Sequence, residues 1–359
     1  MSAPGDTPTA PAATTPATAP PPGSGDGRGP TATSSRRGPG LAGLAEAYAL
    51  AALTIALLVF FAVLPASSGT FFTADNLKIV AADQAVLLVV SIAVLFPMVA
   101  NTWDFTPGAV AGLTAVFAAS AVSSSGSILV AIAVALGVGV AIGIINGILI
   151  TRARINSVIA TLGMTIVIEG IVQWKTGGKP IVNGIPGALT DFGAGSVLGV
   201  PKLAWTALIL CGLVYWLLSR TVYGRRLYAI GSNAAAARLV GLRTERLVFT
   251  TYIASGLLAG AAGMLLLCRT GVGNPSSGPS YILPAYAAIF LGATAVSPGR
   301  WNVWGLVIAV LFLGILNSGL TLAGANPYIN SLVNGLALIG GVATANILAR
   351  RRGKALEIS

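Results

Sequence analysis

Apolar runs long enough to cross a lipid bilayer recur along this chain and constrain its fold more than any other feature. A membrane-spanning helix needs about 20 consecutive apolar residues. Charged residues make up only 9% of the 359 residues, whereas soluble domains carry about 25%. The runs are continuous rather than alternating, which indicates helices. The sequence therefore predicts an all-α integral membrane protein with about ten transmembrane helices, near residues 44–64, 79–100, 107–123, 127–150, 155–173, 203–219, 247–268, 282–296, 301–322 and 329–348.

Two of these runs are shorter than the others. The third run, 107–123, and the eighth, 282–296, have Gly and Pro neighbours. Either run is a candidate for a partial or broken helix buried among the other spans.

Composition divides the chain into three parts. Residues 1–40 are rich in Pro, Ala, Thr, Gly and Ser, and such a segment cannot bury enough apolar surface to fold. We expect a disordered cytoplasmic tail there, a transmembrane domain over 41–350 and a cytoplasmic C-terminal tail over 351–359. Arg36 and Arg37 precede the first run as in a signal sequence, but the length of that run favours an uncleaved first span.

The basic residues predict the orientation. With the N-terminus inside, 16 of the 21 Lys and Arg residues fall on the inner side of a ten-span map. The positive-inside rule expects this imbalance in the cytoplasmic membrane. Both termini should therefore be cytoplasmic, and the net charge of +11 reflects topology rather than binding to nucleic acid.

The residue inventory excludes several kinds of chemistry. The chain has no His and two Cys, Cys211 and Cys268, both inside apolar stretches. Zinc clusters and Cys–His nucleophile pairs are therefore not expected, while a disulfide is neither required nor excluded. No G-x-x-x-x-G-K-[ST] phosphate loop occurs, so the chain should have no ATPase site of its own.

The connection from Arg220 to Arg246 is the longest hydrophilic one on the predicted inner side. Ser232 or Asn233 can cap a short helix over 234–239, and Gly241 can end it in the left-handed conformation. A capped helix in such a loop is a natural docking element. The alternative is an ordinary basic loop.

This region carries a resemblance to a known family. YGRRLYAIGSNAAAARLVGLRTERLVFTTYIASGLLAGAAGML, INGILITRARINSVIATLGM, TGGKPI and TAVSPGRWNVWGLVIAVLFLGILNSGL resemble the permeases of ribose-type sugar ABC importers, in the branched-chain amino acid/ribose permease superfamily. The likeness covers roughly residues 75–348. It departs from the family in the Ala-only start of the short helix, in NTWDFTPG before the third span and in VSPGRW, which puts the exact solute in doubt.

The resemblance implies a set of partners. A separate ATPase subunit would bind the ATP, so no cofactor is expected in this chain. An extracytoplasmic solute-binding protein would deliver a sugar, and a second permease copy would complete the pathway in the bacterial cell membrane. The residues implied to dock the ATPase are Arg225, Arg226, Asn233, Ala236, Arg238, Leu239 and Gly241.

Polar and aromatic residues at membrane depth are candidates for the translocation path. Ionisable groups there are costly and are functional suspects, which singles out Asp83, Asp104 and Glu169; Asp104 is also favoured by the resemblance. Hydroxyl partners and an aromatic wall suit a sugar. The candidates are Trp103, Asp104, Glu169, Gln173, Asn146 and Asn317, with Asn334 and Trp174 in addition. The alternative for any Asn or Gln is an interhelical hydrogen bond.

Three other functions stay open at this point. An ion-coupled secondary transporter would use the intramembrane carboxylates as ion sites, but it would leave the capped loop unexplained. An ABC permease for nucleosides or branched-chain amino acids fits the same topology. A membrane-embedded enzyme has little support, because the chain has no His and no paired carboxylate motif.

Overall fold

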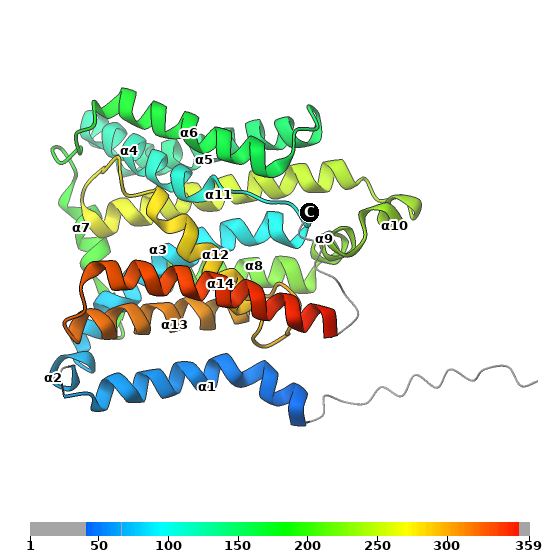
Figure 1. Cartoon of the computed structure of the whole chain (residues 1–359). Coiled ribbons are helices and arrows are strands. Elements are labelled where there is room, and N and C mark those ends of the chain that lie inside the picture. The colour runs from blue at the N-terminus through cyan, green and yellow to red at the C-terminus, as the bar shows by residue number, and fades with distance from the viewer. Residues whose placement is uncertain (1–40, 66, 352–359) are drawn as a thin grey trace, which may run out of the picture. The chain divides into compact units, whose positions relative to one another are not determined.

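The computed structural model describes residues 41–65 and 67–351 of the chain, and almost all of them lie in helices (Figure 1). The predicted tails at 1–40 and 352–359 lie outside the described residues. The elements are α1 (Leu41–Val63), α2 (Ser68–Phe71), α3 (Ala74–Val99), α4 (Pro107–Ser125), α5 (Ile128–Thr151), α6 (Ser157–Thr176), α7 (Gly187–Ala194), β1 (Ser196–Val197), β2 (Val200–Pro201), α8 (Lys202–Arg220), α9 (Val222–Ser232), α10 (Ala234–Leu239), α11 (Thr244–Thr270), the 3₁₀ turn η1 (Pro279–Tyr281), α12 (Ile282–Gly292), α13 (Val303–Leu322) and α14 (Pro327–Arg351).

Each of the ten apolar runs forms a helix, which confirms the all-α membrane fold. Among the described residues, eight helices are long and apolar enough to cross a bilayer: α3, α4, α5, α6, α8, α11, α13 and α14. The described apolar part of α1 and the α12 region are shorter. The third run is therefore a full-length helix, α4, whereas the eighth run ends early, at Gly292.

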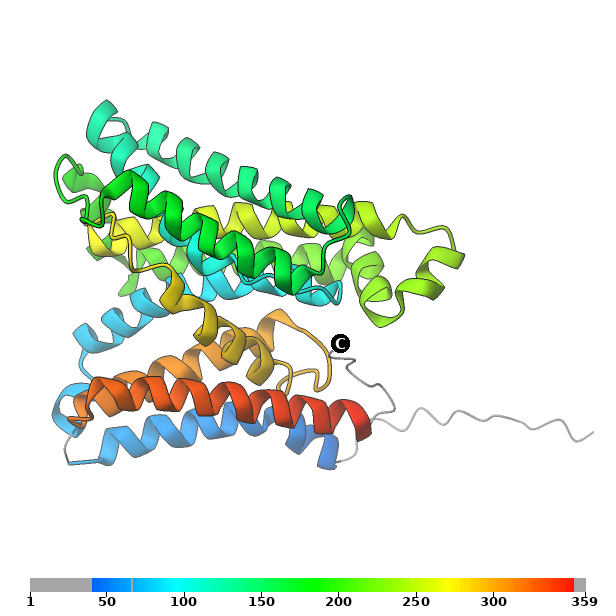
Figure 2. The same ribbon diagram turned by 45° about the horizontal axis from the view of Figure 1, so that its top comes forward.

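The helices run roughly along one direction and form two groups (Figures 1 and 2). In Figure 2, one group contains α4, α5, α6 and α11, the other contains α1, α13 and α14, and α12 crosses between them. α3 packs against members of both groups. The most enclosed helices are α3, α4 and α11, whereas α6 and α14 leave most of their surface exposed.

α5 and α11 pack through the glycines that their sequences predict. A Cβ on Gly139 would collide with the carbonyl oxygen of Gly256, and one on Gly143 would collide with that of Tyr252. Small residues let helix backbones approach closely where lipid supplies no hydrophobic drive for association. The glycine spacing therefore has a packing role.

The two ends of the bundle differ. α9 and α10 lie at one end, and α7 lies at the other (Figure 1). β1 and β2 form a two-residue antiparallel hairpin directly before α8. α9 was not predicted, although Thr221 caps it and Tyr223, Leu227 and Ile230 follow helical spacing.

Candidate functional site

The clearest polar site lies in the non-helical segment that joins α3 to α4, residues 101–106, which we call the central segment. Asn101 has a left-handed backbone, with φ of 58°, and it ends α3. Pro107 then opens α4, at a position where a missing N–H costs nothing. Ser255, which contacts the segment, lies 11 residues after the start of α11, or about 16 Å along that helix. The segment is thus well inside a hydrocarbon layer of about 30 Å.

Asp104 is the anchor of the central segment, and its side chain is 2% exposed. Its Oδ1 accepts hydrogen bonds from the Thr106 backbone N–H (3.0 Å) and from Thr106 Oγ1 (2.6 Å). Its Oδ2 accepts one from Ser255 Oγ (2.7 Å). Asn146 Nδ2 donates in turn to Thr106 Oγ1 (3.0 Å). These donors satisfy a carboxyl group that would otherwise be very costly to bury.

Side chains from three helices, α6, α11 and α12, also bond to the backbone of the segment. Tyr286 Oη donates to the Asp104 carbonyl (2.9 Å), and Tyr252 Oη donates to the Trp103 carbonyl (2.8 Å). The Trp103 N–H donates to Ser157 Oγ (3.2 Å), and Thr165 Oγ1 donates to the Phe105 carbonyl (3.2 Å). Irregular backbone is tolerated at membrane depth only where it is buried in protein or lines a water-filled cavity. The surrounding protein thus supplies hydrogen-bond partners for the irregular backbone of this segment.

An aromatic cluster covers one side of the segment. The rings of Trp103 and Phe105 are parallel, with centroids 6.0 Å apart and 4° between their planes. Tyr286 lies 5.7 Å from Trp103 and 4.8 Å from Phe105. Trp103 and Phe105 remain partly exposed. The segment therefore combines partly open aromatic faces with buried polar groups.

The predicted path residues separate into two groups. Trp103, Asp104 and Asn146 meet at the central segment. Glu169, Gln173 and Trp174 lie on the exposed surface of α6, and Trp174 is 82% exposed.

Two further candidates are paired elsewhere. Asn317 Nδ2 donates to Asn334 Oδ1 (3.3 Å), which is the interhelical bond that the alternative interpretation expects. Asp83 pairs with Arg269 (2.8 Å) and so joins α3 to α11.

The α9–α10 end matches the prediction for the capped loop. Asn233 Oδ1 accepts from the Ala236 N–H (2.9 Å) at the start of α10. Gly241 follows the helix with φ of 81°. Leu239 and Val240 at the tip are 90% and 77% exposed. The capped helix is confirmed, and it presents apolar side chains outward.

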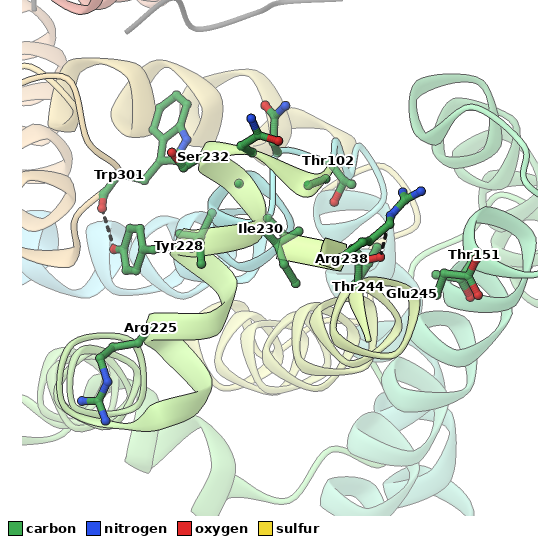
Figure 3. A pocket seen from close by; sticks show the side chains of 18 of the residues that line it. Thr102, Thr151, Arg225, Tyr228, Ile230, Ser232, Arg238, Thr244, Glu245 and Trp301 are labelled. Carbon is green, nitrogen blue, oxygen red and sulfur yellow. Dashed lines mark hydrogen bonds between the residues drawn. The ribbon is translucent and has the colours of Figure 1, made fainter. Parts of the chain in front are cut away.

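Beside this tip lies a hollow of about 1360 Å³, shown in Figure 3. Its lining includes Thr102 of the central segment, four arginines (Arg154, Arg225, Arg238 and Arg300) and Glu245. Arg238 Nε donates to Thr244 Oγ1 (3.2 Å). The exposed arginines give the hollow a basic lining. Arg226 and Ala236 are also exposed at this end.

The described residues offer no site for a metal ion. No group of three or more His, Cys, Asp or Glu side chains in 41–65 and 67–351 is arranged to hold one. Cys211 and Cys268 are buried free thiols.

Comparison with known proteins identifies the family. The family described as branched-chain amino acid transport system / permease component matches residues 76–342. The ribose import permease protein RbsC of Escherichia coli is 34% identical over 295 residues, which cover 81% of this chain and 92% of the relative. The counterpart in Haemophilus influenzae is 30% identical over 83% of this chain and 93% of the relative.

A third relative is named for the import of a different solute. The autoinducer 2 import system permease protein LsrC of Salmonella typhi is 30% identical over 80% of this chain and 82% of the relative. No solved structure matches significantly. The chain therefore belongs to the branched-chain amino acid transport system permease family, as a multi-pass protein of the inner membrane.

Proposed function

We propose that this chain is the membrane-spanning subunit of an ATP-driven importer for ribose or a similar sugar. The observation that carries the proposal is the central segment, where partly exposed aromatic faces lie beside polar side chains at membrane depth. Sugars need hydroxyl partners together with an apolar or aromatic wall. The relatives support this solute class, since two of them are ribose import permeases. A branched-chain amino acid would need partners for its charged ammonium and carboxylate.

The α6 surface supports a second copy of the chain as a partner. Glu169 and Gln173 are exposed there, and a charged side chain facing lipid at mid-membrane costs about 2.5–3.5 kcal/mol. Gly163 and Gly170 have open space beside them, which allows another backbone to approach. We place α6 at an aqueous pathway between two copies, with Glu169 and Gln173 toward the water.

The α9–α10 end supports a separate ATPase subunit as the source of energy. The exposed Leu239 and Val240 form an apolar tip on α10, and the neighbouring hollow is lined by arginines. Exposed apolar side chains beside charged ones are typical of a protein interface. On this proposal the α9–α10 end faces the cytoplasm, and the α7 end meets the solute-binding protein.

The intramembrane carboxylates give less support to an ion-coupled transporter. Asp83 is paired with Arg269, and both oxygens of Asp104 accept hydrogen bonds from protein groups. An ion-coupling carboxylate must release or bind its ion during each cycle. Glu169, the remaining candidate, lies on the α6 surface already assigned to the pathway.

The test is uptake of radiolabelled ribose by cells that carry the chain, its ATPase subunit and its solute-binding protein. The matched strain carries an ATPase whose phosphate-loop Lys is replaced by Ala. We expect ribose uptake only with the intact ATPase, and no uptake of labelled leucine in either strain. Uptake that persists with the inactive ATPase and is abolished by a protonophore would show an ion-coupled transporter instead. ATP-dependent leucine uptake without ribose uptake would assign an amino acid permease.

A further inference from the structure

α9 connects the proposed docking helix to the central segment. A single residue, Asn233, separates the end of α9 from the start of α10. At that end of α9, a Cβ on Gly231 would collide with the carbonyl oxygen of Val99 and would lie 3.5 Å from the Asn101 backbone N. Val99 and Asn101 flank the point where α3 ends and the central segment begins. α9 thus lies against the base of the segment with no side chain between the two backbones.

A second connection runs through Tyr228, in the middle of α9. Its hydroxyl donates a hydrogen bond of 2.7 Å to the carbonyl of Trp301 (Figure 3). The Arg300 guanidinium lies 5.2 Å from the centre of the Tyr228 ring, within the range of a cation–π contact. α9 is therefore attached to the loop that precedes α13.

Aromatic rings continue this connection to the path. The Trp301 ring packs edge-on against Phe290 of α12, with centroids 5.4 Å apart and 73° between the planes. Phe290 lies 6.2 Å from Trp103, which is the partly exposed ring of the central segment. Aromatic rings have few rotatable bonds and pack at fixed distances. A displacement of Tyr228 therefore either moves Trp301 together with its ring contacts or breaks the hydrogen bond to the Trp301 carbonyl.

We propose that Tyr228 is a positioning residue that couples movement of the docking helix to the solute path, through Trp301, Phe290 and Trp103. The inference rests on the proposed function, because it requires an ATPase that moves α10. Its physical content is one hydrogen bond that attaches α9 to the aromatic row. Without this bond, movement of α9 reaches the central segment only through the backbone contact at Gly231.

The test compares two tyrosines of the same helix. Tyr228→Phe removes the hydroxyl that bonds Trp301 and keeps the ring under Arg300. Tyr223→Phe is the matched control, since the Tyr223 hydroxyl contacts Thr250 Oγ1 (3.0 Å) and lies outside the row. Each variant is purified with the ATPase subunit and reconstituted in proteoliposomes with the solute-binding protein. Labelled ribose taken up and ATP hydrolysed are measured in the same vesicles.

We expect Tyr228→Phe to keep the wild-type amount of bound ATPase and its rate of hydrolysis. Ribose transported per ATP should fall about fivefold, the factor that matches about 1 kcal/mol for a lost hydrogen bond. Tyr223→Phe should leave the ratio unchanged. Phe290→Leu interrupts the same row at another point. The double variant Tyr228→Phe/Phe290→Leu should have a ratio of ribose to ATP no lower than that of the more impaired single variant, because both changes break one connection.

Two results would overturn the inference and leave the proposed function intact. One is a wild-type ratio of ribose to ATP in Tyr228→Phe. The other is an equal fall in the ratio for both tyrosine variants, which would mean that α9 only needs its hydroxyls for local stability. A wild-type transporter in which ATP drives no uptake of ribose or of any similar sugar would instead refute the proposed function itself.

Discussion

Replacement of Asp104 tests whether the central segment is held as the structure indicates. Asp104→Ala removes the acceptor of three hydrogen bonds, two from Thr106 and one from Ser255. Hydrogen bonds to charged groups contribute about 1.5–3 kcal/mol each, but bonds that share one acceptor group are not additive. Bonds between membrane helices average only about 0.6 kcal/mol. The contacts of Asp104 are short and fully buried, which favours the value for hydrogen bonds to charged groups. We expect the free energy of unfolding to fall by about 3–5 kcal/mol.

The conservative variant should be milder for a specific reason. Asp104→Asn keeps Oδ1 as an acceptor for both Thr106 donors. Its new amide group faces Ser255 Oγ, and that hydroxyl can rotate to accept instead of donate. We expect the free energy of unfolding of Asp104→Asn to fall by about 1–2 kcal/mol. Ser255→Ala, which removes one charge-assisted bond, should give a loss of similar size.

Thermal unfolding in detergent is the measurement, followed by size-exclusion chromatography of each variant. At about 2 °C per kcal/mol for a large domain, the Ala variant should melt roughly 6–10 °C below wild type and the Asn variant roughly 2–4 °C below. Asp75→Asn is the matched control, because the Asp75 side chain is 93% exposed and its ion pair with Lys78 is long, at 3.9 Å. A melting temperature for Asp104→Ala within about 1 °C of wild type would refute the anchoring role.

Three further predictions concern the ends and the surface of the bundle. Gly241→Val places a β-branched residue at a φ of 81°, which costs about 1–3 kcal/mol of strain. The abundance of the variant in the membrane should stay normal, while co-purification of the ATPase weakens and ribose uptake is lost. Full uptake by the variant would mean that the segment is an ordinary loop. Glu169→Gln should leave abundance unchanged and raise the ribose concentration for half-maximal uptake at least about threefold, the factor for roughly 0.7 kcal/mol; an unchanged concentration dependence would remove Glu169 from the pathway. Burial raises the pKa of Tyr228 against the opposing effect of Arg300. The stabilising contribution of Tyr228 should therefore be complete below the unfolded pKa of about 10 and be lost as pH rises through the folded pKa. The ratio of ribose transported to ATP hydrolysed should then stay flat from about pH 6 to 9. A decline in that range that Tyr228→Phe abolishes would contradict this.

Local patterns were sufficient to predict the parts of this protein that depend on neighbouring residues. Apolar run length located ten of the fourteen α-helices among the described residues, and the Asn233 cap with Gly241 located α10, because each signal acts within a few residues. α9 was missed because its charged residues and glycines made the segment read as a loop. The spacing of Leu227 and Ile230 was the signal available for it.

The partners of the central segment could not be predicted in this way. Asp104 was found from its charge at membrane depth, but Ser255 and Tyr286 lie 151 and 182 residues further along the chain. Both belong to types that occur throughout apolar helices, so nothing in their own surroundings marks them. The pairing of Asp83 with Arg269 was hidden for the same reason.

The distance between Asp104 and its partners has a consequence for the biogenesis of this protein. At a synthesis rate of about 5–20 residues per second, the 151 residues to Ser255 take roughly 8–30 s. During that interval α3 and α4 have emerged from the ribosome, while the helix that bears Ser255 has not. The carboxyl group must wait without that partner, at a depth where lipid is a poor solvent for it. We therefore expect the early helices to stay beside the aqueous part of the insertion machinery until α11 arrives, which would make release into lipid a late step of assembly.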